Sequence, residues 1–231
     1  MMQLANQPFD CTHCGKKFMQ EKTLYAHMCE PKRRFMQRDE KRVQAGFFAF
    51  NRYYRLVQGA KKDKTYEDFC KSAYYNAFVK FGSFVNNVNP LYPDKFVDYV
   101  IKSGVKLDHW CRDQLYETYL YEMIKMEPVE SAVQRSLSTM MEWGDAHDTI
   151  WTHYFLYASQ SRIIQHLRDG KISPWLLFNC ESGKEFLKGL NSDQLEMLAP
   201  AVDFQGWVGK INKSKADANV VKEVCREAGI P

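Results

Sequence analysis

Residues 9–29 read FDCTHCGKKFMQEKTLYAHMC and hold the most specific pattern in the chain. Cys11 and Cys14 are separated by two residues, and twelve residues lie between Cys14 and His27. A Cys-x2-Cys turn directs two thiolates towards one point, and a histidine beyond a short helix can reach the same metal ion. The spacing therefore predicts a zinc site near the start of the chain.

Three apolar side chains accompany this pattern, at Phe9, Phe18 and Leu24. They are too few to form a core, so we expect metal binding to supply most of the folding free energy of the segment, about 10 kcal/mol. Together with the cysteines and the histidine, these anchors make the segment resemble the C2H2 zinc-finger family. The resemblance implies a β-hairpin followed by a helix from about Gln20 to His27. We call residues 9–29 the finger.

The fourth ligand departs from the family pattern. The family has a His or Cys three to five residues after the first histidine, whereas Cys29 lies only two residues after His27. On a regular helix these two side chains would point about 200° apart and could not reach one metal ion. Pro31 disfavours helix at Glu30, so we expect the chain to unwind at Met28 and Cys29 and to turn the thiolate inward. The predicted zinc ligands are Cys11, Cys14, His27 and Cys29.

Length and composition allow one compact domain with a small appendage, or two small domains. The chain has 231 residues, of which 45% are hydrophobic and 14% aromatic. It has no run of 18 apolar residues that could span a membrane, and its first residues do not resemble a signal peptide. Four cysteines stand alone outside the finger, which favours a reducing, intracellular setting, either the cytoplasm of a prokaryotic or phage-infected cell or a nucleus. They are Cys70, Cys111, Cys180 and Cys225.

Charge is distributed unevenly along the chain, although the net charge is only +4. Residues 1–64 hold 14 Lys and Arg against 6 Asp and Glu, whereas the remainder holds 18 against 22. An excess of cations at one end favours binding to a polyanion, of which nucleic acid is the most plausible. The alternative is that the basic run after Pro31 is simply a solvated helix face.

Hydrophobic periodicity predicts helices throughout the chain after the finger. We expect glycines 59, 104, 144 and 170 to end or break helices, and Thr65 to begin one with a capping box. The sequence therefore predicts a mainly α fold, with a ββα zinc-finger-like module in residues 1–30, a basic helix and linker in residues 31–64, and a multi-helix globular domain in residues 65–231. The expected helices cover about residues 34–57, 65–85, 93–101, 108–123, 128–140, 147–168, 174–178, 184–190, 192–198 and 219–228.

The zinc-finger resemblance also implies which residues would meet DNA. In the docking mode of the family, base edges are read from the position before the helix and from its third and sixth residues, here Gln20, Thr23 and Ala26. This is a weak set of base readers, so we expect mainly phosphate contacts from neighbouring cations. The candidate nucleic-acid-binding residues are Lys16, Lys17, Gln20, Lys22, Thr23, Lys32, Arg33, Arg34, Arg38, Lys41 and Arg42.

Aromatic residues beyond the finger alternate with cations, a combination that suits stacking on single-stranded nucleic acid. Packing in a helical core is the competing interpretation, and Phe48, Tyr53 and Tyr75 would be the exposed rings that distinguish the two. Catalytic signals are weak. His147 and His153 are six residues apart and do not share a helix face, and neither a phosphate loop, a nucleophile elbow nor a dinucleotide fingerprint occurs.

These observations predict a non-catalytic, zinc-containing nucleic-acid-binding protein with an accessory or regulatory role. The finger and the following basic helix would hold DNA phosphates, and the helical body would bind a protein partner. In size, basic N-terminal half and helical body, the chain resembles the helicase-loading proteins of T4-type phages, without a shared signature motif. The alternative is a protein-interaction adaptor or assembly component in which the zinc finger is purely structural.

Overall fold

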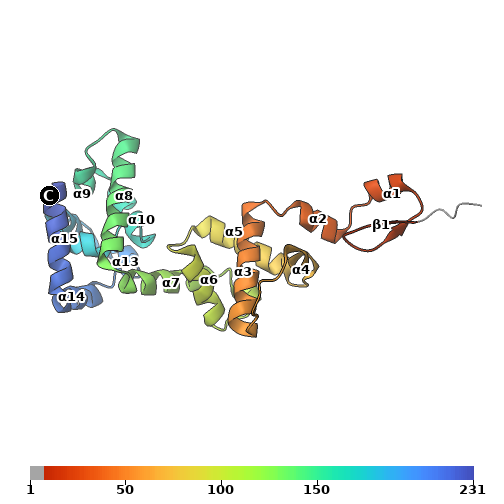
Figure 1. The fold of residues 1–231 in the computed structure, drawn as a ribbon. Coiled ribbons are helices and arrows are strands. Elements are labelled where there is room, and N and C mark those ends of the chain that lie inside the picture. Colours follow the sequence, from red (N-terminus) through yellow and green to blue (C-terminus); the bar gives the residue numbers. More distant parts are fainter. Residues whose placement is uncertain (1–7) are drawn as a thin grey trace, which may run out of the picture. The chain divides into compact units, whose positions relative to one another are not determined.

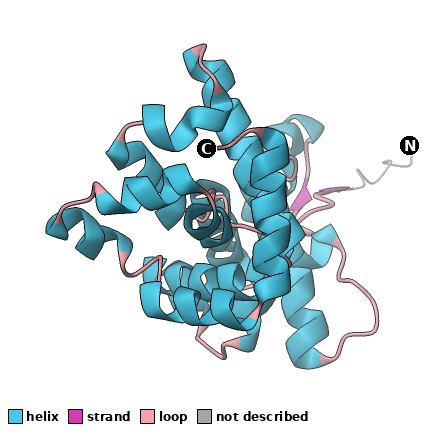
Figure 2. Cartoon of the chain, turned by 90° about the vertical axis from the view of Figure 1, so that its left-hand side faces the viewer, coloured by secondary structure: helices cyan, strands magenta, loops and turns pink. Residues whose placement is uncertain are grey.

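The structure is a computed structural model that describes residues 8–231, and it is mainly α-helical. Figure 1 shows the order of the helices along the chain, and Figure 2 shows that the described strands form one small ribbon near the N-terminus. These observations confirm the predicted fold class, helices after an N-terminal ββα segment. The chain divides into two compact units, one ending at Tyr116 and the other beginning at Glu117.

The first unit begins with the finger and continues into helices that pack around an aromatic core. The boundaries expected at residues 30 and 64 stay a prediction. Its elements are β1 (Phe9–Asp10), β2 (Lys17–Phe18), α1 (Glu21–Ala26), α2 (Glu30–Met36), α3 (Lys41–Gln58), α4 (Tyr66–Lys71), α5 (Tyr75–Val88), α6 (Pro93–Lys102) and η1 (Leu107–His109), followed by the start of α7 (Asp113–Met126).

Helices α3 and α5 form the closest helix pair of this unit, and two glycines allow their approach. A side chain on Gly46 would lie 2.7 Å from the carbonyl oxygen of Phe78, and one on Gly82 would overlap the carbonyl group of Arg42. Because neither position can hold a Cβ without moving backbone, the two helix axes come closer than ordinary side chains permit. The crossing fixes the position of Phe78 against α3 and so orders the core.

The core of the first unit consists mainly of aromatic rings. Phe69 lies 5.0 Å from Phe50 between ring centroids, and Phe78 lies 5.4 Å from Phe50 in an edge-to-face arrangement. Trp110 closes the core, with its ring 5.7 Å from Phe78 and its indole N–H donating to the carbonyl of Val105 at 2.9 Å. Such pairs add to the free energy of area burial.

The second unit is built from shorter helices around one long helix, α8. Its elements are the end of α7, then α8 (Val129–His147), η2 (Trp151–His153), α9 (Tyr154–Tyr157), α10 (Gln160–Arg168), α11 (Pro174–Asn179), α12 (Glu181–Lys188), α13 (Ser192–Leu198), α14 (Phe204–Lys213) and α15 (Lys215–Ala228).

Most buried polar groups of the second unit are paired, as burial requires, but the indole N–H of Trp175 has no partner among the described residues. The carboxylate of Glu127 is buried and forms an ion pair with Arg135, which also donates to the carbonyl of Gly170 at 2.7 Å. His166 is buried, and its Nδ1 lies 2.8 Å from the hydroxyl of Tyr154. None of the helices among residues 8–231 combines the length and apolar character needed to cross a bilayer.

Several predicted helices are interrupted in the structure. The single helix expected over residues 34–57 is wrong, because residues 37–40 separate α2 from α3. The helix expected over 65–85 does begin with the predicted capping box at Thr65, but it ends at Lys71 and α5 begins at Tyr75. Arg34 explains the second interruption, because its guanidinium donates to the carbonyls of Cys70 and Ser72.

The region after Gly144 also differs from the prediction. Helix α8 continues through Gly144 to His147, and the expected helix over 147–168 is replaced by η2, α9 and α10. A side chain on Gly144 would lie 2.7 Å from Cβ of Trp151, so this glycine permits a close contact and does not end the helix. The chain turns at Asp148, where φ is +49°.

Two further segments differ from the prediction. Asp108 lies in the short η1 segment, and α7 begins only at Asp113. Helix α14 was not predicted, although its cap is a sequence signal, since Asp203 accepts from the Gly206 amide at 3.0 Å.

Candidate metal centre

The two strands of the finger create the turn that carries Cys11 and Cys14. Phe9 pairs with Phe18 and Asp10 with Lys17 in an antiparallel ribbon. The amide of Cys11 donates to the carbonyl of Lys16 at 2.9 Å, which closes the turn above the ribbon.

Gly15 completes this turn in a left-handed conformation, with φ of +71°, and its amide donates to the carbonyl of Cys11 at 2.7 Å. A glycine adopts this conformation without the steric cost that other residues incur. The turn therefore brings the two thiols onto one side, as the Cys-x2-Cys spacing predicts.

The chain unwinds after α1, which solves the geometric problem of His27 and Cys29. Helix α1 ends at Ala26, His27 is extended with ψ of 121°, and Cys29 is extended with φ of −92° and ψ of 162°. The unwinding was predicted at Met28 and Cys29, and it begins one residue earlier. The expectation for Glu30 is wrong: Glu30 begins α2 and Pro31 occupies its first turn, where the missing N–H costs little.

Four ligand atoms converge as a result. One such atom from each of four side chains lies within 4.8 Å of the other three. Two of the separations are 3.9 Å, between Sγ of Cys11 and Sγ of Cys29, and 3.3 Å, between Sγ of Cys14 and Nε2 of His27. The group consists of Cys11, Cys14, His27 and Cys29, and it is the one such cluster found between residues 8 and 231.

These separations fit a tetrahedral zinc ion. Ligand atoms about 2.0–2.3 Å from zinc lie about 3.5–3.8 Å from one another at tetrahedral angles. Four protein ligands fill the coordination shell, which is the arrangement of structural zinc sites, whereas catalytic sites keep a position open for water. The donor set and its spacing could therefore hold a metal ion.

The electrostatics of the thiols also favour a cation. Burial raises the pKa of Cys11. Hydrogen bonds from the amides of His13 and Cys14 and from the adjoining thiols lower it by more, so the pKa lies below its ordinary value. The Lys16 amide lowers the pKa of Cys14, but burial and the charge of Cys11 outweigh it, so the pKa lies above its ordinary value. Neighbouring thiolates repel each other unless a metal ion neutralises them.

Neighbouring groups hold the ligands in place. The ring of Phe18 lies 4.8 Å from the imidazole of His27, and the ammonium of Lys32 donates to the carbonyl of His27 at 3.1 Å. His13 turns away from the cluster and packs 5.1 Å from the ring of Phe35 on α2. Phe9 remains 39% exposed and α1 buries no residue, so the finger has almost no apolar core of its own.

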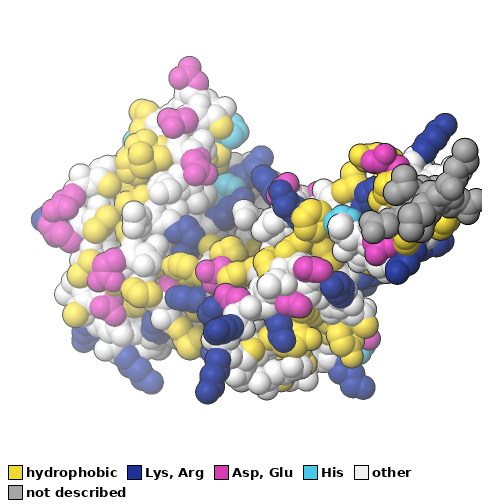
Figure 3. Space-filling model, turned by 45° about the vertical axis from the view of Figure 1, so that its right-hand side comes forward, with side chains coloured by type: hydrophobic (Ala, Val, Ile, Leu, Met, Phe, Trp, Pro, Cys, Tyr) yellow, Lys and Arg dark blue, Asp and Glu magenta, His cyan; other side chains and the backbone are white. Residues whose placement is uncertain are grey.

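The candidate nucleic-acid-binding residues of the finger lie at its surface. Gln20 precedes α1 and makes no side-chain cap, and Thr23 lies on the first turn of that helix. Figure 3 shows Lys and Arg side chains on the surface of the finger. The exposed members of the set are Lys16, Lys17, Gln20, Lys22 and Thr23.

The candidate residues of α2 and α3 fall into two groups. Arg33, Arg38 and Arg42 are each about half exposed or more and form ion pairs with neighbouring surface carboxylates, and Lys41 is exposed. The guanidinium of Arg38 also lies 5.3 Å from the ring centre of Phe35. Arg34 differs, because only 14% of its side chain is exposed.

Arg34 is held from several sides. It bonds to Glu30 and to two carbonyls at the end of α4, and its guanidinium lies 4.5 Å from the ring centre of Tyr75. The backbone carbonyl of Arg34 accepts from the hydroxyl of Tyr66 at 2.7 Å. Arg34 therefore links α2 to α4, and its guanidinium contacts groups of the protein itself.

The three aromatic residues that could distinguish base stacking from core packing differ in their exposure to solvent. Tyr75 is buried, and Tyr53 packs against Phe78 and Trp110 at ring distances of 6.0 and 6.1 Å. Phe48 is 37% exposed on α3. Only Phe48 is thus placed where a base could stack on it.

Comparison of the chain with protein-family models, curated proteins and solved structures gives no match.

Proposed function

We propose that this is a non-catalytic, zinc-containing nucleic-acid-binding protein with an accessory or regulatory role. The observation that carries the proposal is a ligand cluster for a structural metal surrounded by exposed cations that continue along α2 and α3. The first unit holds 20 Lys and Arg against 12 Asp and Glu, a net charge of +8. A surface of this kind attracts phosphates and releases their counterions.

Zinc bound by three thiolates and a neutral imidazole has a formal charge of about −1, so the metal itself does not attract phosphates. The attraction comes from the neighbouring side chains, among them Lys16, Lys17 and Lys22 on the finger and Arg33 and Lys41 beyond it. In this proposal the zinc ion orders the finger and the cations hold the nucleic-acid backbone. The closed coordination shell supports a non-catalytic role.

The setting that we infer is intracellular. All seven cysteines are free thiols, including the four that lie outside the ligand cluster. Zinc thiolates need cysteines that stay reduced, and a reducing compartment supplies that condition.

A salt titration tests the proposal. Anisotropy of a labelled DNA duplex and of a single strand should report binding that weakens more than about tenfold between 50 and 200 mM salt, because several phosphates are neutralised. Reversal of charge at Arg33, Arg38 and Arg42, each to Glu, should abolish this binding. Undiminished binding by that variant would contradict the proposed surface.

A matched control is available on the second unit. Reversal of three exposed cations of α15, Lys215, Lys222 and Arg226, changes the net charge by the same amount without touching the first unit. We expect this control to reduce affinity far less, because nearby charges dominate at physiological ionic strength. Equal losses in both triple variants would mean that only total charge matters and would contradict a localised site.

A protein-docking role is the second candidate, and exposed apolar side chains on the second unit favour it. Ile150, Leu156 and Tyr157 are 60%, 51% and 60% exposed around η2 and α9, and Met141 of α8 is 48% exposed. Such side chains are typical of a protein interface. If docking is the main role, Ile150→Asp with Tyr157→Asp should remove a co-purifying protein and leave nucleic-acid binding unchanged.

A further inference from the structure

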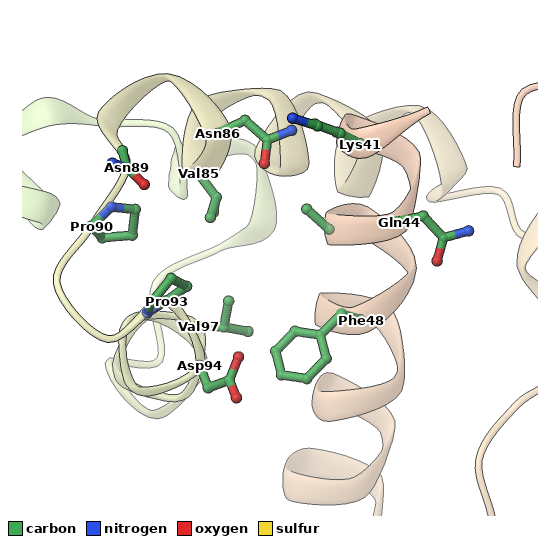
Figure 4. A pocket seen from close by; sticks show the side chains of 11 residues that line it. Lys41, Gln44, Phe48, Val85, Asn86, Asn89, Pro90, Pro93, Asp94 and Val97 are labelled. Carbon is green, nitrogen blue, oxygen red and sulfur yellow. The ribbon is translucent and has the colours of Figure 1, made fainter. Parts of the chain in front are cut away.

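A pocket of about 470 Å³ opens between α3, the end of α5 and the start of α6, within the first unit. Figure 4 shows its labelled side chains, with Phe48 directed into the space from α3 and with Val85 and Val97 on the side across from that helix. The volume lies within the range of about 300–1,000 Å³ that is usual for small-ligand sites. The pocket is separate from the metal-ligand cluster.

One wall of the pocket is an aromatic face. Phe48 is 37% exposed, whereas Val85 and Val97 are 7% and 2% exposed and form an apolar floor. Pro90 and Pro93 limit the opposite side, and both are rigid. A flat ring could therefore lie on Phe48 and exclude water from both surfaces.

The polar side chains of the pocket differ in charge between its two ends. In Figure 4 Lys41 and Asn86 lie at one end, and Asp94 lies at the other end beside Phe48. The side chains of Lys41, Asn86 and Asn89 make no hydrogen bond or ion pair within residues 8–231, so their donors and acceptors are available to a ligand. The cationic end would suit a phosphate, and the anionic end would suit an N–H donor.

We infer that this pocket holds one base of a single-stranded nucleic acid. The inference rests on the proposed function and names a contact that the exposed cations alone would not make. The base stacks on Phe48, its sugar–phosphate lies near Lys41, and its exocyclic amino group donates to the carboxylate of Asp94. Arg42, next to Lys41 in sequence, is exposed and could hold the adjoining phosphate.

This geometry carries a base preference. Cytosine and adenine carry an exocyclic amino group at the position where thymine and uracil carry the O4 carbonyl oxygen, and this is the position that faces Asp94. An oxygen facing Asp94 would place two acceptors against each other. The pocket should therefore favour cytosine or adenine over thymine.

Anisotropy titrations with labelled oligo-dC and oligo-dT test the inference in low salt. The full-length protein should bind oligo-dC more tightly than oligo-dT. Phe48→Ala should weaken binding to oligo-dC by at least about fivefold, the lower end of the loss of one stacked base. Tyr74→Ala is the matched control, because Tyr74 is 61% exposed on the same unit and lies outside the pocket. It should leave affinity unchanged.

Asp94→Ala gives a second readout that does not depend on the stability of the Phe48 variant. It should bring the ratio of the two affinities close to one, even though removal of a negative charge raises both. Far-UV circular dichroism verifies that each variant is folded.

The outcomes separate the pocket from the proposed function. If the protein binds both strands, the charge-reversal variant fails to bind, and Phe48→Ala behaves like Tyr74→Ala, the pocket inference is overturned and the proposed function stands. An unchanged dC-to-dT ratio in Asp94→Ala also overturns it. If the wild-type protein binds no strand at either salt concentration, both proposals fall.

Discussion

Helix α1 of the finger buries no residue, whereas α5 of the same unit buries five. The finger brings four ligand atoms together and leaves its apolar anchors partly exposed. The helices after it do the opposite, since they bury rings such as Phe50, Phe69 and Phe78 and hold no comparable ligand cluster among the described residues. One chain thus contains a region whose fold should depend on a metal ion and a region whose fold depends on apolar burial.

The largest expected effect comes from breaking the ligand set. Cys14→Ser should release zinc and unfold residues 9–29, because metal binding supplies about 10 kcal/mol or more in such modules. The far-UV signal of the helices beyond the finger should remain. Zinc content and amide exchange of the two regions measure the result.

Cys111→Ser is the control for this variant, because Cys111 is a half-buried lone thiol outside the cluster. It should keep its zinc. Loss of the helical signal together with zinc in Cys14→Ser would contradict the independence of the two regions.

The converse variant removes a ring from the core of the first unit. Trp110 is 2% exposed and packs 5.1 Å from Phe81, so Trp110→Ala should destabilise this unit by about 3–5 kcal/mol. Chemical denaturation followed by circular dichroism measures the change. Zinc content below the unfolding transition should stay at the wild-type level, and a variant that folds but lacks zinc would show that the core holds the ligands in place.

Arg33 and Arg34 lie on α2, between the finger and the aromatic core, and substitution of each should affect stability differently. Arg34→Ala removes the guanidinium donor from the carbonyls of Cys70 and Ser72, of which Ser72 keeps the amide of Tyr75, and should cost about 1.5–3 kcal/mol. Arg33→Ala removes an exposed ion pair with Glu30 and should cost at most about 1 kcal/mol. The affinity for DNA should fall more in Arg33→Ala than in Arg34→Ala. Equal stability losses in the two variants would contradict the structural role of Arg34.

The smallest effect is a pH dependence confined to the second unit. Burial, together with the nearby charges of Lys171 and Arg162, lowers the pKa of His166 to about 4. The unfolded chain therefore binds a proton near pH 6.5 that the folded chain does not bind until about pH 4. Stability should be complete above pH 6.5 and fall as the pH decreases, by about 1–2 kcal/mol at pH 5.

His166→Gln tests this dependence. Its free energy of unfolding should change less between pH 7 and pH 5 than that of the wild type, whatever its absolute value. The metal-ligand cluster is the same in both proteins, so any acid release of a metal ion cancels in the comparison. Equal slopes would mean that His166 does not titrate differently in the two states.

The ligand cluster could be predicted because its signal is local. Two cysteines in a tight turn and a histidine after one short helix leave little freedom, and the prediction of Cys29 needed only a helix that ends early. The helix ends at Ala26, before His27, so the 200° separation never arises. The helical class was predictable for a similar reason, since apolar periodicity is a property of neighbouring residues.

The interruptions could not be predicted in the same way. The break before Tyr75 depends on Arg34, which lies about 40 residues earlier in the chain, and the continuation of α8 through Gly144 depends on the approach of Trp151. The exposure of side chains could not be predicted either, because Phe48 and Tyr75 are both aromatic residues in helical segments that also carry cations. In the folded chain, the guanidinium of Arg34 covers the ring of Tyr75, whereas Phe48 lines a pocket.

X-ray absorption at the zinc edge of the purified protein tests the central claim most directly. The metal content should be one zinc ion per chain, and the first shell should contain three sulfur atoms at about 2.3 Å and one nitrogen atom at about 2.0 Å. A protein without stoichiometric metal, or a shell of oxygen and nitrogen atoms alone, would contradict the account.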